Sequence, residues 1–347
     1  MARPHPSQSG KEQSALLSDD TRRIDRATPA IDNFRGDYAN LAALIQKSWS
    51  ENNRQPLLYT PDFLKSLFEY PEASFSLAPT LYTGTNPIAF SAGLPRRMRF
   101  RGRDIRVVTS TLLTVSPEFK KHGYGIVLWS ELVKRARAAG FDGMLNFCID
   151  GEPMNGMIVG CARRLNLPIE RIFSAHYSSV LLRPAGSREP TPDSDNGSVE
   201  ELLRLAAPLS DSVPLGRLWS AEEAQWQCMH RAGAITARHT AGSRSGMLTG
   251  YVMEVDRPDR AQCLLVEDVL WGTLTADERL YLLRKLLHRA AASGVRMATV
   301  PDLHYADMQP FTVAGFRSSK RILHAYLTIW NGDALTEPLP SIYLDVF

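Results

Sequence analysis

The sequence predicts an α+β protein built from two similar halves, each with a mixed, mostly antiparallel central sheet flanked by helices. Short apolar runs of strand length alternate with segments in which apolar residues recur at helical spacing. The same order of elements occurs twice, before and after a polar stretch near residue 190. With 347 residues, 44% of them hydrophobic and 22% charged, the chain is long enough for two such cores.

Two polar stretches divide the chain. Residues 1–24 are rich in Ser, Gln, Pro and charge and have no apolar periodicity, so we expect a disordered N-terminal arm. Residues 185–198 are almost wholly turn-forming and polar, which is typical of an interdomain linker. The predicted organisation is therefore an arm, a first domain at 25–184, a linker at 185–198 and a second domain at 199–347.

In the first half, apolar periodicity predicts four helices and six strands. The helices are expected at 37–49, 61–69, 125–139 and 155–165. The strands are expected at 29–34, 76–84, 86–100, 105–115, 142–148 and 176–184. The third helix has Trp129, Leu132, Val133 and Ala136 on one face, and Gly140 is well placed to end it.

The second half repeats this outline. Strands are expected at 247–255, 263–271, 295–301 and 321–330, with short helices at 199–207 and 310–315. Thr275 and Glu278 have the spacing of a capping box, which predicts a long helix that ends at Gly294. Its expected buried face consists of Leu280, Leu283, Leu287 and Ala291.

Composition narrows the class of protein. The formal net charge of +3 fits a local anion site but does not require a nucleic-acid surface, so we expect no nucleic-acid partner. The four cysteines are widely spaced, which is typical of buried thiols in a reducing compartment and predicts no metal site. The first twenty residues have no apolar signal region, and no run approaches the roughly 20 apolar residues of a membrane span. We therefore expect a cytoplasmic protein without a membrane partner.

The segment VSPEFKKHGYG at 115–125 joins a predicted strand to a predicted helix. The first turn of a helix has N–H groups without intrahelical partners and a partial positive charge, so it can bind a pyrophosphate. Gly123 and Gly125 would let a phosphate approach the backbone, and the basic run at 120–122 adds positive charge. An ordinary strand-to-helix turn with solvated lysines could use the same residues.

This segment resembles motif A of the GNAT acyltransferase superfamily, which has the form V-x-P-E-Y-(R/Q)-x-x-G-x-(G/A). Phe119 stands for the aromatic residue of the motif and Lys120 for its Arg or Gln. The order of elements over 30–184 resembles the family too. The direct matches are Val115, Pro117, Glu118, Gly123 and Gly125. The resemblance implies that acetyl-CoA or another acyl-CoA is the cosubstrate and that no metal is needed.

The resemblance also implies roles for particular residues. Backbone amides of 121–126 would bind the CoA pyrophosphate, and backbone groups of 113–115 would bind the pantetheine arm and polarise the thioester carbonyl. Asn155 matches an Asn that the family often has before its fourth helix, although it would serve equally as a helix cap. The implied cofactor-binding residues are Leu113, Thr114, Val115, Lys120, Lys121, His122, Gly123, Tyr124, Gly125, Ile126 and Asn155.

The catalytic groups are less clear from the sequence. The family often has a Tyr seven residues after that Asn, as the acid that protonates the leaving thiolate, but this chain has Ala162 there, next to Cys161. Asp150 and Glu152 follow the strand at 142–148 and are the first candidates for a general base, with Tyr177 on the closing strand as a third. Each of them could also be an ordinary loop or edge residue.

The second half resembles the family only in part. PFTVAGF at 310–316 is similar to the signature at the end of the family's last helix. Its expected phosphate loop, however, reads WGTLTADERL and has Asp277 and Glu278 where an anion should bind, so carboxylates would repel a pyrophosphate. We therefore predict a degenerate GNAT-like domain that helps to form the acceptor pocket.

The expected function is that of an acyl-CoA-dependent N-acyltransferase, with acetyl-CoA as the expected donor, that acylates a small-molecule amine by direct attack on the thioester. One alternative is a Fem-like transferase that uses aminoacyl-tRNA, but the low net charge and the intact motif argue against it. Another is a non-catalytic module that binds CoA or a protein partner, because the acid Tyr is missing. The acceptor, the acyl chain length and the oligomeric state are not determined by the sequence.

Overall fold

One sheet runs through both halves of the molecule. The structure is a computed structural model that describes residues 29–50, 57–151, 153–183, 198–255, 261–331 and 337–346. The predicted arm, and the predicted linker except Ser198, lie outside these ranges. Among the described residues, thirteen strands form the sheet, and its main path is β1-β3-β4-β5-β6-β13-β7-β12-β11-β10-β2. Strands β8 and β9 pair with β4 and β10, beside that path.

The first half follows the predicted order of elements. Its helices are α1 (Tyr38–Ser50), α2 (Pro61–Phe68), α3 (Tyr124–Ala138) and α4 (Pro153–Arg164), with the short 3-10 helices η1 (Phe75–Leu77) and η2 (Pro117–His122). Its strands are β1 (Ala30–Asn33), β2 (Leu57–Leu58), β3 (Pro79–Thr83), β4 (Asn86–Phe100), β5 (Arg103–Val115), β6 (Gly143–Ile149) and β7 (Glu170–Leu181). The predicted face of α3 is confirmed, because Trp129, Leu132, Val133 and Ala136 are all buried.

The second half contains the predicted elements and several more. Its helices are α5 (Val199–Ser212), α6 (Ala221–Gln225), the π-helical turn η3 (Trp226–His230), α7 (Ala276–Ala292) and α8 (Gln309–Val313). Its strands are β8 (Leu215–Arg217), β9 (Ala234–Ala241), β10 (Arg244–Val255), β11 (Ala261–Leu270), β12 (Met297–Pro301) and β13 (Arg317–Ile329). The capping box of Thr275 and Glu278 at the start of α7 is confirmed.

Three sequence predictions need correction. The buried residues of α7 are Leu282, Leu283, Leu286 and Ala290, so the face is turned from the predicted one; adjacent leucines give two overlapping stripes, and packing on β9 and β10 selects one. Helix α5 continues past Ala207 to Ser212 with Pro208 inside it. Strand β7 begins at Glu170, because pairing with β13 extends it over residues 170–175, where Ile172, Phe173 and Ala175 are buried.

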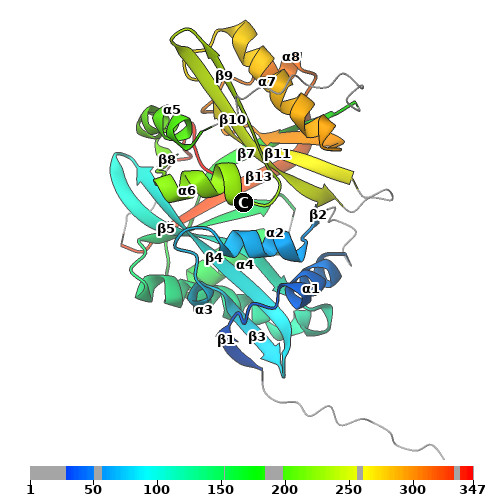
Figure 1. The fold of residues 1–347 in the computed structure, drawn as a ribbon. Helices are drawn as coiled ribbons and strands as arrows, with labels where there is room; N and C mark the ends of the chain where they lie inside the picture. Colours follow the sequence, from blue (N-terminus) through cyan, green and yellow to red (C-terminus); the bar gives the residue numbers. More distant parts are fainter. Residues whose placement is uncertain are drawn as a thin grey trace, which may run out of the picture.

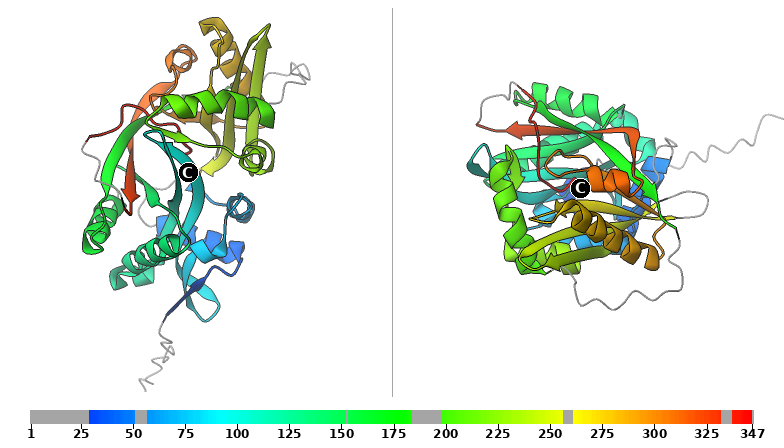
Figure 2. Two further views of the ribbon diagram at one scale, coloured as in Figure 1. Left: turned by 90° about the vertical axis from the view of Figure 1, so that its left-hand side faces the viewer. Right: turned by 90° about the horizontal axis from the view of Figure 1, so that it is seen from above.

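The two halves exchange their last strands. Strand β13 of the second half lies between β6 and β7 of the first, and β7 lies between β13 and β12 of the second. Figure 1 shows β7 and β13 next to each other in the middle of the molecule. Both views in Figure 2 show the orange-red β13 beside the green β7. Because antiparallel pairs of β13 with both β6 and β7 hold the halves together, neither half completes its sheet alone.

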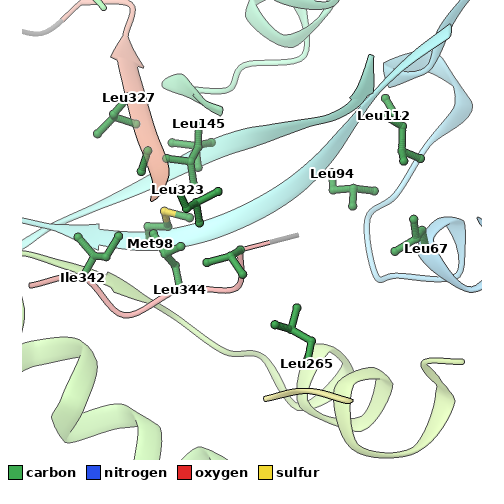
Figure 3. Packing of buried hydrophobic residues seen from close by; sticks show 14 of the residues in the cluster. Leu67, Leu94, Met98, Leu112, Leu145, Leu265, Leu323, Leu327, Ile342 and Leu344 are labelled. Atoms are coloured by element: carbon green, nitrogen blue, oxygen red, sulfur yellow. The ribbon is translucent and has the colours of Figure 1, made fainter. Parts of the chain in front are cut away.

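The largest hydrophobic core also belongs to both halves. Figure 3 shows Leu94, Met98 and Leu145 of the first half close to Leu323, Leu327, Ile342 and Leu344 of the second. Burying one such side chain stabilises the fold by about 1.5–3 kcal/mol, so this cluster resists separation of the halves. Other cores lie under α3 and α4 and under α7. Within the described ranges, none of the helices combines the length and apolar character that a membrane span needs.

Candidate active site

Strands β5 and β6 run parallel and then diverge. Their register continues from Val107 opposite Gly143 to Ser110 opposite Asn146, where the described pairing ends. Beyond it, β5 continues to Val115 and β6 to Ile149 without pairing to each other. The facing backbone edges of 111–115 and 147–149 therefore have no hydrogen-bond ladder between them. This stretch of β5 includes residues 113–115, whose backbone would bind pantetheine according to the motif resemblance.

A β-bulge marks the point of divergence. The register of β4 with β5 shifts at Leu112 and Leu113, and Leu112 has a φ of 55°. Bulges and left-handed residues other than glycine often re-aim a strand at functional sites. Leu112 packs into the central core and Leu113 packs toward α3 and α4, while the Thr114 hydroxyl donates to the Leu112 carbonyl at 2.9 Å. Packing on both faces thus holds the bent strand in place.

The loop after β5 ends at a helix start without a side-chain cap. The Ser116 amide donates to the Ile88 carbonyl, η2 follows, and Gly123 has a φ of 74° just before α3. A Cβ on Gly123 would meet nothing within 4 Å, so the residue is glycine for its backbone conformation. A Cβ on Gly125 would lie 3.3 Å from the Met157 sulfur, so α4 packs closely there.

The basic residues of the loop face solvent. Lys120, Lys121 and His122 are exposed beside the first turn of α3. The Ile126 amide donates to the Gly123 carbonyl at 3.0 Å, so the first turn already uses it. The imidazole of His122 stacks on the Tyr124 ring, with centroids 5.5 Å apart and planes at 27°. The result is a cationic surface with a flat ring face at its edge.

Glu118, the acidic residue of the motif, holds the loop to α1. Its carboxylate forms an ion pair with Lys47 at the end of α1 and accepts a hydrogen bond from the Ser116 hydroxyl. The Lys47 ammonium and then the Ser116 hydroxyl lower the pKa of Glu118 to about 2. The carboxylate charge is therefore neutralised by Lys47 beside the loop.

Of the predicted catalytic residues, Asp150 lies at the open end of β6. Its amide donates to the Ile322 carbonyl on β13 at 2.8 Å, and its carboxylate faces the imidazole of His324 on the same strand at 3.4 Å. His324 is a polar residue of this region that the sequence analysis missed, because it lies 174 positions away and looked like an ordinary strand residue. Glu152 lies outside the described residues, as does the side chain of Asn155, whose backbone belongs to α4.

Tyr177 lies elsewhere. It is three residues along β7 from Ser174, so the two side chains point to opposite faces of the sheet. Tyr177 packs on the central core. Its role as a catalytic group stays a prediction, and the structure does not bring it together with Asp150.

The position at which the family often has its acid Tyr is buried in this chain. Ala162 and Cys161 are both buried in the cluster beneath α3 and α4. Burial raises the pKa of the Cys161 thiol, which makes it a poorer acid than a free cysteine. A structural role for this thiol agrees with both observations.

The second half repeats the diverging strands but fills the opening. Strands β11 and β12 pair in parallel from Cys263 to Leu265, and a register shift of β10 on β11 follows at the position of Glu267. Beyond it, the Tyr305 hydroxyl accepts from the Val269 amide and donates to the Glu267 carbonyl, each at 3.0 Å. The start of α7 is occupied by its own capping box. A side chain thus takes the strand edge that β5 leaves open.

Comparisons with known proteins identify the fold. No protein-family model and no curated protein matches this sequence. A structure of Saccharomyces cerevisiae N-myristoyltransferase with bound myristoyl-CoA and inhibitors matches with a TM-score of 0.65 and 12% identity, over 96% of this chain and 86% of that one. Another structure of the yeast enzyme with bound myristoyl-CoA gives the same TM-score and identity, over 96% and 89% of the two chains.

These likenesses confirm the predicted fold class, a mixed sheet with two tandem GNAT-like halves. More particularly, the chain has the fold of N-myristoyltransferase across nearly its whole length. At 12% identity the likeness establishes the fold alone.

Proposed function

We propose that this protein is an acyl-CoA-dependent N-acyltransferase whose first half binds the acyl-CoA. One observation carries the proposal: the open edge of β5 leads directly into a glycine loop and a helix start that no side chain caps. Together they offer backbone donors along a line from a thioester to a pyrophosphate. The motif at 115–125 and the likeness to two myristoyl-CoA complexes support the same assignment.

The proposed binding site divides into two parts. Backbone groups of Leu113, Thr114 and Val115 bind the pantetheine arm, and one of their amides polarises the thioester carbonyl. The pyrophosphate lies against the backbone of 121–125, beside the cationic side chains of the loop. The Ile126 amide already donates to the Gly123 carbonyl within the first helix turn, so it contributes least to pyrophosphate binding.

The proposed reaction is direct transfer to an amine. The amine nitrogen attacks the thioester carbon, a base accepts the nitrogen's proton, the C–S bond breaks, and the thiolate takes a proton from water. Asp150 is the proposed base, because it lies at the open end of β6 and its side chain is 65% exposed to solvent. Water can act as the acid that protonates the leaving thiolate, because a thiolate is a good leaving group.

For the donor we propose acetyl-CoA, and for the acceptor a small-molecule amine. The motif supports the first choice, whereas the neighbouring structures contain myristoyl-CoA. Isothermal titration with acetyl-, octanoyl- and myristoyl-CoA ranks the donors. Thiol release with small amines and with peptides bearing a free N-terminus then ranks the acceptors. Binding without release on any acceptor would favour a non-catalytic module, and binding of charged tRNA alone a Fem-like transferase.

A pair of glycine variants tests the site itself. Gly123→Glu places a carboxylate at the phosphate loop and should weaken acyl-CoA binding about 10-fold or more, through charge repulsion. Gly140→Glu is the matched control: Gly140 ends α3 with a φ of 76°, and a Cβ there also meets nothing within 4 Å. Both variants bear the same backbone strain, so equal acyl-CoA affinity in the two would overturn the proposed site.

A further inference from the structure

A chain of three polar side chains crosses β6, β13 and β7 beside the proposed active site. The Ser174 hydroxyl lies 2.8 Å from Nδ1 of His324, and Nε2 of His324 lies 3.4 Å from Oδ1 of Asp150. His324 pairs directly with Cys148 on β6 and with Ser174 on β7. The three side chains thus come from β7, from β13 and from the residue that follows β6, and the central one belongs to the second half of the chain.

The two ends of the contact between His324 and Asp150 differ strongly in their exposure to solvent. His324 is only 6% exposed, whereas the Asp150 side chain is 65% exposed. A neutral imidazole carries one proton, so it can accept from the Ser174 hydroxyl at Nδ1 and donate to Asp150 from Nε2. This arrangement satisfies both ring nitrogens and directs one donor at the carboxylate. The imidazole is therefore the fixed part, and the carboxylate is the part that reaches solvent and substrate.

The location of Asp150 connects this cluster with acyl transfer. Asp150 is four residues beyond Asn146, where the pairing of β5 with β6 ends, which places it about 13 Å along the opening. Leu113 to Val115 lie at a comparable distance, about 10–16 Å, on the other wall. The Asp150 carboxylate therefore lies at the depth where the thioester is proposed to bind.

We propose that His324 is a positioning residue for acyl transfer, which holds Asp150 as the base for the acceptor amine; this inference rests on the proposed function. As the nitrogen bonds to the thioester carbon, its proton passes to the Asp150 carboxylate and CoA leaves as the thiolate, which takes a proton from water. Asp150 then releases its proton to solvent. His324 takes no part in the bond changes; its hydrogen bond to Asp150, 3.4 Å long in this structure, shortens when substrate is bound.

Strand exchange gives this role its structural basis. Asp150 is held twice by β13, through its amide on the Ile322 carbonyl and through its carboxylate on His324. The second half, whose own strand opening is filled by Tyr305, thereby contributes to the site of the first.

Steady-state kinetics on four variants of the full chain test the proposal. Asp150→Asn should lower kcat about 100-fold or more, as for loss of a general base. His324→Leu should lower kcat about 10- to 100-fold, because the carboxylate is no longer held, without weakening acyl-CoA binding in titration. His324→Gln, which keeps a donor near the position of Nε2, should recover most of that loss. The double variant should be no slower than Asp150→Asn alone, since the two residues act as one unit.

Thr328→Val serves as the packing control, because Thr328 is buried on the same strand but lies opposite Met144, at the far end of β6. Its kcat should stay near that of the wild type. Unchanged kcat in His324→Leu, or losses that add fully in the double variant, would overturn the positioning role while leaving the proposed function intact. A wild-type chain that transfers no acyl group to any acceptor would overturn both.

Discussion

The two halves of this molecule share one arrangement of strands and helix, but they differ in whether side chains bind the backbone groups at the strand edge and at the helix start. In each half a pair of parallel strands diverges next to a bulge, and a long helix follows. In the first half the edge of β5 and the start of α3 stay open; in the second, Tyr305 occupies the edge of β11 and a capping box occupies the start of α7. Under the proposed function, this backbone arrangement is a ligand site in the first half and a structural element in the second, according to which backbone groups the chain's own side chains bind.

This difference has an energetic side. A side-chain cap stabilises a helix start by about 1 kcal/mol, and a hydrogen bond to a strand edge adds a similar amount. The second half gains both, whereas the first half leaves the corresponding groups available. We infer that the first half gives up some intrinsic stability for binding. The shared core and the exchanged strands then hold both halves in one folded unit.

The largest predicted effect tests whether the halves are one unit. Arg96 of the first half and Arg217 of the second both pair with Asp345, at 2.6 and 3.2 Å, and all three are nearly inaccessible to solvent. Although burial alone would raise it, Arg217 and Arg96 hold the pKa of Asp345 well below its usual range. Asp345→Asn should cost about 3–5 kcal/mol, because two guanidinium groups lose their buried counter-charge.

Denaturant unfolding followed by tryptophan fluorescence measures this cost. Asp211→Asn, which breaks an exposed pair with Arg99, should change the unfolding free energy little. Unfolding of the Asp345 variant in two separate steps would contradict the view of the halves as one cooperative unit.

The intermediate effect tests how the second site is closed. Tyr305→Phe removes the hydroxyl that joins Val269 to Glu267 and should cost about 1–3 kcal/mol, because two backbone groups lose their partner. It should not create a second acyl-CoA site, since the α7 start keeps its cap and its carboxylates. Titration with acyl-CoA should therefore give one site per chain in both proteins. A stoichiometry of two in the variant would show that Tyr305 alone closes the second half.

The smallest effect compares two acidic residues, Glu118 in the 3-10 helix η2 that precedes α3 and Glu278 in the first turn of α7. Glu118 pairs with Lys47, and Glu278 pairs with Arg244 at 2.6 Å; these contacts help lower the pKa of each carboxyl to about 2. Because these values lie below the unfolded value of about 4.3, each contributes stability that is present above about pH 4.3 and is lost as the pH falls through about 2. Either Gln variant should therefore have a lower Tm than the wild type at pH 7, with the difference vanishing near pH 2.

The affinity for acyl-CoA should distinguish the Glu118→Gln variant from the Glu278→Gln variant. Glu118→Gln should also weaken acyl-CoA binding about two- to five-fold, because α1 no longer holds the phosphate loop. Glu278→Gln should leave it unchanged. Equal effects of both variants on acyl-CoA affinity would contradict the division of roles between the two halves.

The sequence by itself determined the local features. Helix and strand periods, the capping box at Thr275 and the glycine loop at 123–125 all depend on neighbours within a few positions, so they can be read from the chain. The same holds for the difference between the glycine loop at 123–125 and the acidic segment WGTLTADERL at 271–280. The stripe of α7 shows the limit of such patterns, because adjacent leucines allowed two faces and packing on β9 and β10 selected one.

Only the tertiary structure decided which strands lie side by side. The period of β13 shows that it is a strand but not that it lies between β6 and β7, since ladder hydrogen bonds are the same for any partner. That choice depends on burying apolar faces from both halves at once. It joins Asp150 to His324 and Ser174 and places Tyr305 on β11, and contacts between residues so far apart in the chain leave no local pattern.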